Sequence, residues 1–332
     1  MRGELPVIDI GPLRAGDGEA VGAQLDAACR EVGFFYATGH GVDPSLPARV
    51  DALARTFFAR PDEEKDEIAM ARGGRAWRGW FPLGDELTSG TADRKEGIYF
   101  GAELGPDDPR VARGLPLHGP NLFPREPAAL RSAVLEYLGA LTELGHVLLR
   151  GLALGLGLDP EHIDAHLTHD PTVLFRVFRY PPAVPATADW GVGEHTDYGL
   201  LTILHQDDRG GLEVRSRHGW VAAPPIENAF VCNIGDMLER LTGGRYVSTA
   251  HRVRNTSGHE RVSLAFFFDP AWDAEVRPLP LDGPAEAPGP DDARERWDGA
   301  SVFDLRGTYG EYLLGKVAKV FPALRDAVLT DE

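Results

Sequence analysis

Apolar and polar positions along the first 70 residues alternate between two periods. Residues 5–10 and the aromatic run 33–37 have the β-prone texture of short strands, and the second ends in a glycine-rich turn. Apolar residues recur at helical spacing over 20–32. We expect further helices over 47–58 and over 61–70, where acidic residues near the start suit a helix N-terminus.

The middle of the chain contains a loop-rich region followed by the longest helical signal. Residues 73–125 are rich in Gly, Pro and Asp and are interpreted as mostly ordered loop with short pieces of strand. From about 126 to 154 an apolar stripe predicts a long helix that braces a sheet. Core packing explains this stripe without a cofactor. Its members are Leu130, Val134, Leu138, Leu141, Leu144 and Leu148.

Beyond residue 172 the pattern changes to short β-rich runs separated by turn residues. Many short strands without alternating helices predict an antiparallel sandwich or jelly roll with flanking helices, a mixed α and β fold. The proline-rich stretch 278–292 is interpreted as a linker, and 302–328 as helical. The predicted strands cover 173–178, 200–205, 212–214, 220–223, 229–234, 249–253 and 262–268.

The composition narrows the function classes. The 332 residues carry a formal net charge of −17, from 51 acidic and 34 basic residues, which disfavours nucleic acid and anionic membrane surfaces as partners. The two cysteines, Cys29 and Cys232, exclude a disulfide framework and favour a cytoplasmic setting. No secretory signal and no run of roughly 18 apolar residues is found. The sequence does not specify an oligomeric state, and a monomer is compatible with it.

The segment from Gly193 to Asp197 carries the sharpest local motif. Residues two apart on an extended chain point to the same side, so His195 and Asp197 can present an imidazole nitrogen and a carboxylate oxygen to one metal ion. His251, on a later predicted strand, is the candidate third ligand. Two histidines and one carboxylate leave adjacent coordination positions open, as non-haem Fe(II) oxygenases require. A zinc site of the same ligands remains an alternative at this point.

A second pair lies ten residues after His251. Arg261 and Ser263 are two apart on a predicted strand, so a guanidinium and a hydroxyl face the same side and suit a carboxylate. A 2-oxo acid can chelate the metal through its 2-oxo and 1-carboxylate oxygens while its distal carboxylate reaches this pair. An ordinary salt bridge is the alternative for an isolated Arg-x-Ser. Because this Arg-x-Ser follows the three candidate ligands along the sequence, we favour its interpretation as a clamp for a carboxylate.

The combined pattern resembles the isopenicillin N synthase-like family of 2-oxoglutarate- and Fe(II)-dependent dioxygenases, with features of its bacterial members. The resemblance covers nearly the whole chain. Its motifs are Leu5-Pro6-Val7-Ile8-Asp9, Val32-Gly33-Phe34-Phe35-Tyr36, Asp93-Arg94-Lys95-Glu96-Gly97, Leu117-His118-Gly119-Pro120-Asn121, Tyr180-Pro181-Pro182, His195-Thr196-Asp197-Tyr198-Gly199-Leu200, Asn233-Ile234-Gly235-Asp236 and the stretch from Ser248 to Ser263.

This resemblance implies a distorted double-stranded β-helix, or jelly roll, with helices packed outside and iron at one end. It implies an N-terminal helix and loop region over 1–125 and a catalytic region with a C-terminal helix over 126–332, in one compact unit. It also implies His195, Asp197 and His251 as iron ligands, Arg261 with Ser263 as the 2-oxoglutarate clamp, and Tyr180 near the co-substrate.

The activity implied is oxidation of a small molecule, such as a specialised metabolite or amino-acid derivative, with 2-oxoglutarate and O₂ as co-substrates. Succinate and CO₂ are released, and the outcome is hydroxylation, desaturation or cyclisation. One alternative is an Fe(II) oxidase of the same fold in which Arg261 and Ser263 bind a substrate carboxylate. The others are a non-catalytic small-molecule binding protein and, least favoured, a zinc hydrolase, which would leave the clamp without a role.

Overall fold

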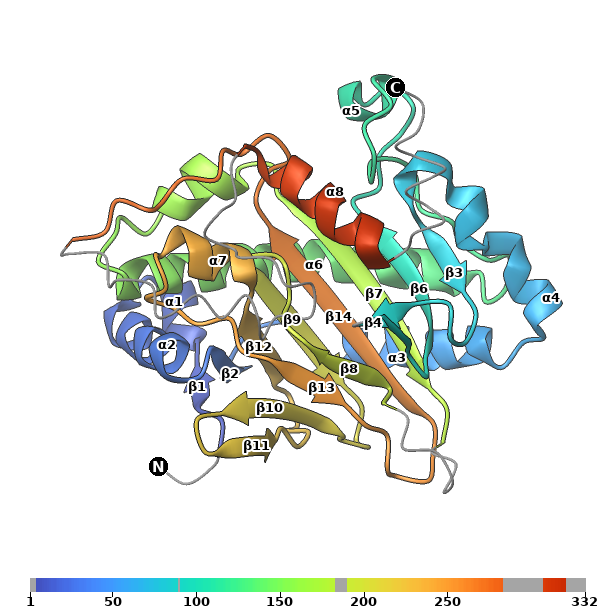
Figure 1. Ribbon diagram of the computed structural model, residues 1–332, viewed down its shortest axis with the longest axis horizontal. Helices are drawn as coiled ribbons and strands as arrows, with labels where there is room; N and C mark the ends of the chain where they lie inside the picture. The colour runs from blue at the N-terminus through green and yellow to red at the C-terminus, as the bar shows by residue number, and fades with distance from the viewer. Residues whose placement is uncertain (1–3, 89, 183–189, 283–306, 321–332) are drawn as a thin grey trace.

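Two β-sheets enclose the centre of the molecule, and a long helix lies across the outer face of the larger sheet (Figure 1). The computed structural model describes residues 4–88, 90–182, 190–282 and 307–320. Both sheets are antiparallel except for the pair β1 and β2, which is parallel. This arrangement is the jelly roll with flanking helices that the run of short strands predicted.

The larger sheet has eight strands. In spatial order they are β1 (Val7–Asp9), β2 (Phe34–Thr38), β12 (Phe230–Ile234), β9 (Leu201–Gln206), β14 (Arg261–Asp269), β7 (Thr172–Tyr180), β6 (Glu96–Gly101) and β3 (Gly79–Phe81). Four of them come from the first 125 residues. That region therefore shares a sheet with the later strands, and the division at residue 125 stays a prediction.

The smaller sheet has four strands and supplies the opposite wall. In spatial order they are β11 (Gly219–Ala222), β10 (Leu212–Ser216), β13 (His251–Val253) and β8 (Val192–His195). A separate hairpin is formed by β4 (Leu87–Thr88) and β5 (Thr91–Ala92).

The helices surround this β-structure. They are α1 (Gly11–Ala15), α2 (Glu19–Glu31), α3 (Ser45–Phe58), α4 (Asp62–Lys65), α5 (Pro109–Ala112), α6 (Ala129–Gly155), α7 (Asp236–Leu241) and α8 (Tyr309–Val320). Short 3₁₀ turns cover Asp66–Ile68 and Met70–Ala76, and a π-helical turn covers Asp164–Thr168. None of the helices within the described ranges combines the length and the apolarity that crossing a membrane demands.

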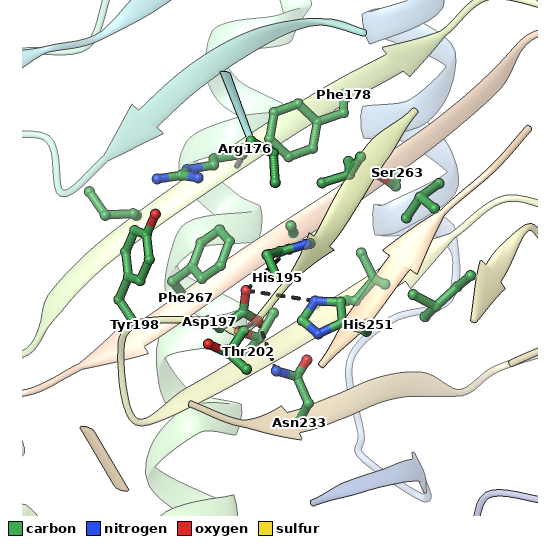
Figure 2. Close-up of a pocket in the computed structure, with 18 of the residues that line it drawn as sticks. Arg176, Phe178, His195, Asp197, Tyr198, Thr202, Asn233, His251, Ser263 and Phe267 are labelled. Atoms are coloured by element: carbon green, nitrogen blue, oxygen red, sulfur yellow. Dashed lines mark hydrogen bonds and ion pairs between the residues drawn. The ribbon is translucent and has the colours of Figure 1, made fainter. Parts of the chain in front are cut away.

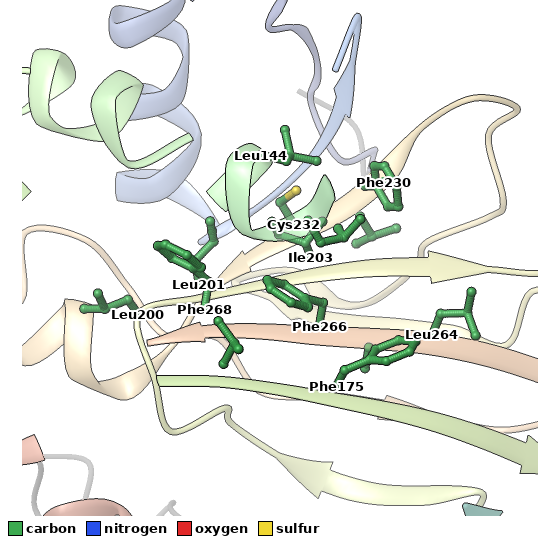
Figure 3. Packing of buried hydrophobic residues seen from close by; sticks show 14 of the residues in the cluster. Leu144, Phe175, Leu200, Leu201, Ile203, Phe230, Cys232, Leu264, Phe266 and Phe268 are labelled. Carbon is green, nitrogen blue, oxygen red and sulfur yellow. The ribbon is translucent and has the colours of Figure 1, made fainter. Parts of the chain in front are cut away.

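Strand β14 divides its side chains between the core and a cavity. Phe266 and Phe268 are fully buried and lie on the side of the sheet that faces α6, where Figure 3 shows them beneath Leu144. Phe267, between them, lines the cavity on the other side. The alternation expected for a strand therefore holds through this run of three aromatic rings. Gly145 of α6 lies against Phe268 so closely that an added Cβ would come within 2.6 Å of the ring.

The sequence predicted the elements well where the periodicity was strong. The stripe over 126–154 forms α6, and all six of its named residues are buried. The region 73–125 contains short strands as expected, although its β6 is completely buried and pairs with β7 along six residues. Of the helix predicted over 302–328, α8 confirms 309–320. Gly307 and Thr308 are described and are not helical, which corrects the predicted start of the helix. Residues 302–306 and 321–328 and most of the predicted linker lie outside the described residues.

Candidate metal centre and its cavity

Two strands of the smaller sheet bring the candidate histidines together. His195 is the last residue of β8 and His251 is the first of β13, and the two are direct partners in the antiparallel register. Asp197 lies two residues beyond the end of β8. Its Oδ1 is 3.8 Å from Nε2 of each histidine. Within the described part of the chain, these three residues form the group suited to hold a metal ion, with ligand atoms within 4.8 Å of one another.

Hydrogen bonds set the tautomer of both imidazoles. His195 Nδ1 lies 2.8 Å from the carbonyl oxygen of Gly193, and His251 Nδ1 lies 3.1 Å from that of Thr249. A carbonyl oxygen only accepts, so each neutral ring donates its proton from Nδ1. The lone pair on each Nε2 is therefore directed at the space beside Asp197, as metal ligation requires.

Asp197 divides its two oxygens between the protein and this space. Oδ2 accepts hydrogen bonds from Thr202 Oγ1 at 2.5 Å and from Asn233 Nδ2 at 2.8 Å, and the side chains meet in Figure 2. Burial opposes ionisation of the carboxyl, but the two histidines and these two donors outweigh it and keep the pKa of Asp197 below its ordinary value. The carboxylate is thus anionic, and Oδ1 is left for an ion.

His195 is held neutral. Burial is the main cause, and the neighbouring His251 adds to it, so the pKa of His195 falls to about 3. A neutral imidazole is the form that binds a metal. The two histidines and the anionic Asp197 together are a ligand set that suits a divalent cation.

Arg261 lies in the same cavity with much of its hydrogen-bonding capacity unused. The residue is fully buried, and its Nε donates to the carbonyl oxygen of Gly210 at 2.6 Å. Nη1 and Nη2 are buried and have no partner among the residues that the structure describes. A buried guanidinium in this state is costly unless an anion completes it. This observation fits a carboxylate ligand.

Ser263 and Tyr180 complete this end of the cavity. The aromatic ring of Tyr180, on β7, lies 4.7 Å from the guanidinium carbon of Arg261, and the two residues are register partners. Ser263 Oγ donates to the hydroxyl of Tyr180 at 3.4 Å. All three residues predicted to bind the co-substrate therefore line one end of the cavity.

A buried carboxyl anchors the loop that carries Asp197. Asp269, at the end of β14, accepts the backbone N–H of Leu200 at 3.0 Å and the hydroxyl of Tyr309 from α8 at 2.6 Å. Gly199 must be glycine here, because a Cβ would lie 1.5 Å from Asp269 Oδ1. The glycine two residues after the candidate ligand thus reflects a close approach of two chain segments.

Several residues of the site were not assigned from the sequence. Asn233 belongs to the motif Asn233-Ile234-Gly235-Asp236 but was not assigned a role, and Thr202 was predicted only as part of the strand 200–205. Arg176 also lines the cavity, on the same side of β7 as Tyr180. Arg176 could have been assigned to the cavity from the sequence, because it lies four residues before Tyr180 on one strand and such residues share a side of the sheet. Arg179, considered as a substrate contact or a surface residue, instead forms ion pairs with Glu96 and Glu260.

The fold and the site define a class of protein: a jelly roll that holds two histidines and one carboxylate in one cavity, the ligand set of mononuclear non-haem iron oxygenases. The same cavity holds a buried arginine whose two Nη atoms have no partner among the described residues. Sequence comparison gives the family. Residues 171–270 match the 2OG-Fe(II) oxygenase superfamily, and residues 5–126 match the N-terminal region of the family described as non-haem dioxygenase in morphine synthesis.

Individual relatives agree with this match. A Dictyostelium discoideum protein named as a probable iron/ascorbate oxidoreductase is 42% identical to this chain. The alignment covers 98% of this chain and 97% of the Dictyostelium protein. A homoarginine-6-hydroxylase of Arabidopsis thaliana is 39% identical, with 96% and 97% covered. A Neurospora crassa protein, solved at full length in complex with alpha-ketoglutarate (2-oxoglutarate), is 27% identical with a TM-score of 0.79, covering 96% of this chain and 97% of its own.

The chain belongs to the 2OG-Fe(II) oxygenase superfamily. It is a 2-oxoglutarate-dependent non-haem iron oxygenase, which confirms the family, the enzyme class and the cofactors expected from the sequence. The resemblance to bacterial members in particular stays a prediction.

Proposed function

We propose that His195, Asp197 and His251 hold Fe(II), and that Arg261 with Ser263 binds the distal carboxylate of 2-oxoglutarate, while a small organic molecule is oxidised beside them. The observation that carries the clamp is the pair of buried Nη atoms on Arg261, which have no hydrogen-bond partner within the described ranges of the chain. An Arg fork gives two parallel charge-assisted hydrogen bonds to one carboxylate, so an anion there would satisfy both nitrogens at once.

When bound, Fe(II) supplies the redox chemistry that couples loss of CO₂ from 2-oxoglutarate to oxidation of the substrate by O₂. The protein's own residues bind and orient. Gly193 and Thr249 fix the ring orientation of the two histidines through their carbonyl oxygens. The ring of Tyr180 packs against the guanidinium of Arg261 and restrains its position in the cavity wall.

The cavity walls keep bulk water from the reacting centre. Phe178, Val192, Leu204, Val253 and Phe267 are apolar residues of the lining, and they come from both sheets. Exclusion of water strengthens the interaction of Arg261 with a carboxylate and protects a reactive oxidant from side reactions. We also propose a cytoplasmic location, supported by Cys29 and Cys232, which are both buried as free thiols.

The test of the ligand assignment is a comparison of iron binding and turnover. We expect His195→Ala and His251→Ala each to abolish binding of Fe(II) and 2-oxoglutarate-dependent O₂ consumption, with the fold intact by circular dichroism. His166→Ala, which changes an exposed histidine outside the cavity, is the matched control. A His195 or His251 variant that keeps full activity without iron would refute the assignment.

Succinate formation discriminates between the two oxidative mechanisms. We expect one succinate for each substrate molecule oxidised. Oxygen consumption that oxidises substrate without turnover of 2-oxoglutarate would instead mark an Fe(II) oxidase, with Arg261 and Ser263 bound to a substrate carboxylate. A protein that binds iron but shows neither activity would support a binding function.

A further inference from the structure

The cavity holds a second arginine at the opposite end from the clamp. In the pairing of β14 with β7, Arg261 lies opposite Tyr180, and Ala265 lies opposite Arg176. Arg261 and Arg176 are therefore four residues apart along the sheet, roughly 13 Å at the rise of a strand. Both line the cavity, and Figure 2 shows Arg176 and Ser263 on opposite sides of the metal-binding group.

Two aromatic rings hold the Arg176 guanidinium in place. Its carbon lies 4.5 Å from the ring centroid of Tyr99 and 4.9 Å from that of Phe267. The side chain is only 16% exposed. Aromatic faces stabilise a guanidinium without using its N–H groups. The rings therefore fix the position of the fork and leave its donors for another partner.

Those donors are poorly used by the protein. Nε of Arg176 is buried and has no hydrogen-bond partner within residues 4–88, 90–182, 190–282 and 307–320. The ion pair of this arginine joins Nη1 to Glu86 Oε1 at 3.7 Å, beyond hydrogen-bond distance. Arg176 is thus a cation at the cavity wall whose donors lack a close acceptor in the described chain.

Glu86 is engaged elsewhere and is not a dedicated counter-ion for Arg176. Its Oε1 accepts the hydroxyl of Tyr99 at 2.6 Å, and its Oε2 lies 3.0 Å from Lys95 Nζ. Lys95 also donates to Asp93 at 2.7 Å. The buried lysine therefore has two close carboxylates. Among the described residues, Glu86 and Asp197 act on Arg176 through longer-range charge interactions, and its ion pair with Glu86 spans 3.7 Å. A ligand with an anionic oxygen would supply the close acceptor that these N–H groups lack within the described residues.

That ligand differs from the co-substrate. In the proposed function, 2-oxoglutarate places one carboxylate at the metal and the other at Arg261, so neither remains for Arg176. We propose that Arg176 binds a carboxylate of the substrate to be oxidised and that it selects small carboxylic acids, amino acids among them, over neutral analogues. This proposal rests on the proposed function of the metal centre. The substrate would lie between Arg176 and the three ligands, held at one end by its acid group.

The experiment measures binding to the enzyme loaded with Fe(II) and 2-oxoglutarate under anaerobic conditions. Titration calorimetry would compare aliphatic, aromatic and basic amino acids and simple monocarboxylic acids, each with its own primary amide. We expect acids to bind the wild type at least about tenfold more tightly than their amides, the value of one charged hydrogen bond. Arg176→Gln should remove this preference, and Arg176→Lys should keep part of it.

Arg179→Gln is the matched control, because Arg179 lies on the same strand but its guanidinium is paired with Glu96 and Glu260 outside the cavity. It should leave the preference for acids unchanged. A structural role of Arg176 would instead lower the melting temperature and weaken binding of acids and amides equally. A wild type that does not prefer any acid to its amide, or an Arg176→Gln variant that retains the preference, overturns the proposal.

The two proposals fail in different ways. Binding of Fe(II) and of 2-oxoglutarate is measured first, in the same preparations, along with slow succinate formation in the absence of substrate. We expect these three to be equal in the wild type and in the control Arg179→Gln. If the wild type binds neither iron nor 2-oxoglutarate, the proposed function is refuted, and the inference about Arg176 is refuted with it. If iron and 2-oxoglutarate both bind but the wild type does not prefer acids to their amides, only the proposed role of Arg176 is refuted.

Discussion

Asn233 donates a hydrogen bond from its Nδ2 to Oδ2 of Asp197, 2.8 Å away, and so leaves Oδ1 facing the two histidines. The amide comes from β12 of the larger sheet, whereas Asp197 follows β8 of the smaller one. The bond therefore joins the two walls of the jelly roll at the metal centre. Thr202 supplies a second donor to the same oxygen.

We expect Asn233→Ala to weaken binding of Fe(II) by about 10- to 100-fold, the usual effect of removing a group that orients a metal ligand. The carboxylate would lose a donor and rotate more freely. Titration of the apoenzyme with Fe(II) measures this. Thr202→Val, which removes the other donor, should act in the same direction. Unchanged iron affinity in both variants would show that Asp197 needs no support.

The second prediction concerns the clamp. Replacing Arg261 by Lys should raise the KM for 2-oxoglutarate by at least about tenfold, because a lysine cannot offer the two parallel donors of the fork. Ser263→Ala removes a single neutral hydroxyl and should have a smaller effect. Steady-state kinetics at varied concentrations of 2-oxoglutarate measure the KM of each variant. An unaltered KM in Arg261→Lys would assign this arginine to the substrate or to the structure.

The third prediction uses the buried carboxyl of Asp269, whose pKa burial raises from 3.8 to about 7. Below about pH 4 the group is protonated in both the folded and the unfolded state. As the pH rises toward about 7, the unfolded state releases this proton first, so the contribution of Asp269 to stability is progressively lost. Asp269→Asn cannot ionise and should not show this loss.

The measurement is urea unfolding of the metal-free protein, with a chelator present, across that pH range. The stability of Asp269→Asn relative to the wild type should increase between about pH 4 and about pH 7. A difference that stays constant with pH would mean that the folded carboxyl is already ionised. Asp159→Asn, at an exposed turn, provides a control for the loss of one acidic group.

The fourth prediction compares two glycines of α6. Gly145→Ala should destabilise the protein by about 1–3 kcal/mol, since the new Cβ would meet the Phe268 ring at 2.6 Å in a packed core. Gly139→Ala meets nothing within 4 Å and should stabilise the helix by up to about 1 kcal/mol. Chemical denaturation of both variants tests this. Equal effects would show that α6 can move away from the sheet.

Local sequence patterns predicted much of this structure. Helical spacing located α6, and the period-two alternation of a strand holds at Phe266, Phe267 and Phe268, because both patterns depend on residues close in sequence. The region 73–125 was harder to predict. Its β6 is buried through pairing with β7, and a partner more than 70 residues away leaves no local signal.

The sequence by itself determined the family and predicted the candidate ligands and the clamp, because His195 with Asp197 and Arg261 with Ser263 are pairs whose common side follows from the extended chain. Only the tertiary structure decided which groups support or complete them. Asn233 reaches Asp197, and Arg176 has no close acceptor in the part of the chain that the structure describes, because sheet register and burial bring together or separate residues that are distant along the chain. Hydrogen-bond partners across a fold depend on that register, which no short motif specifies.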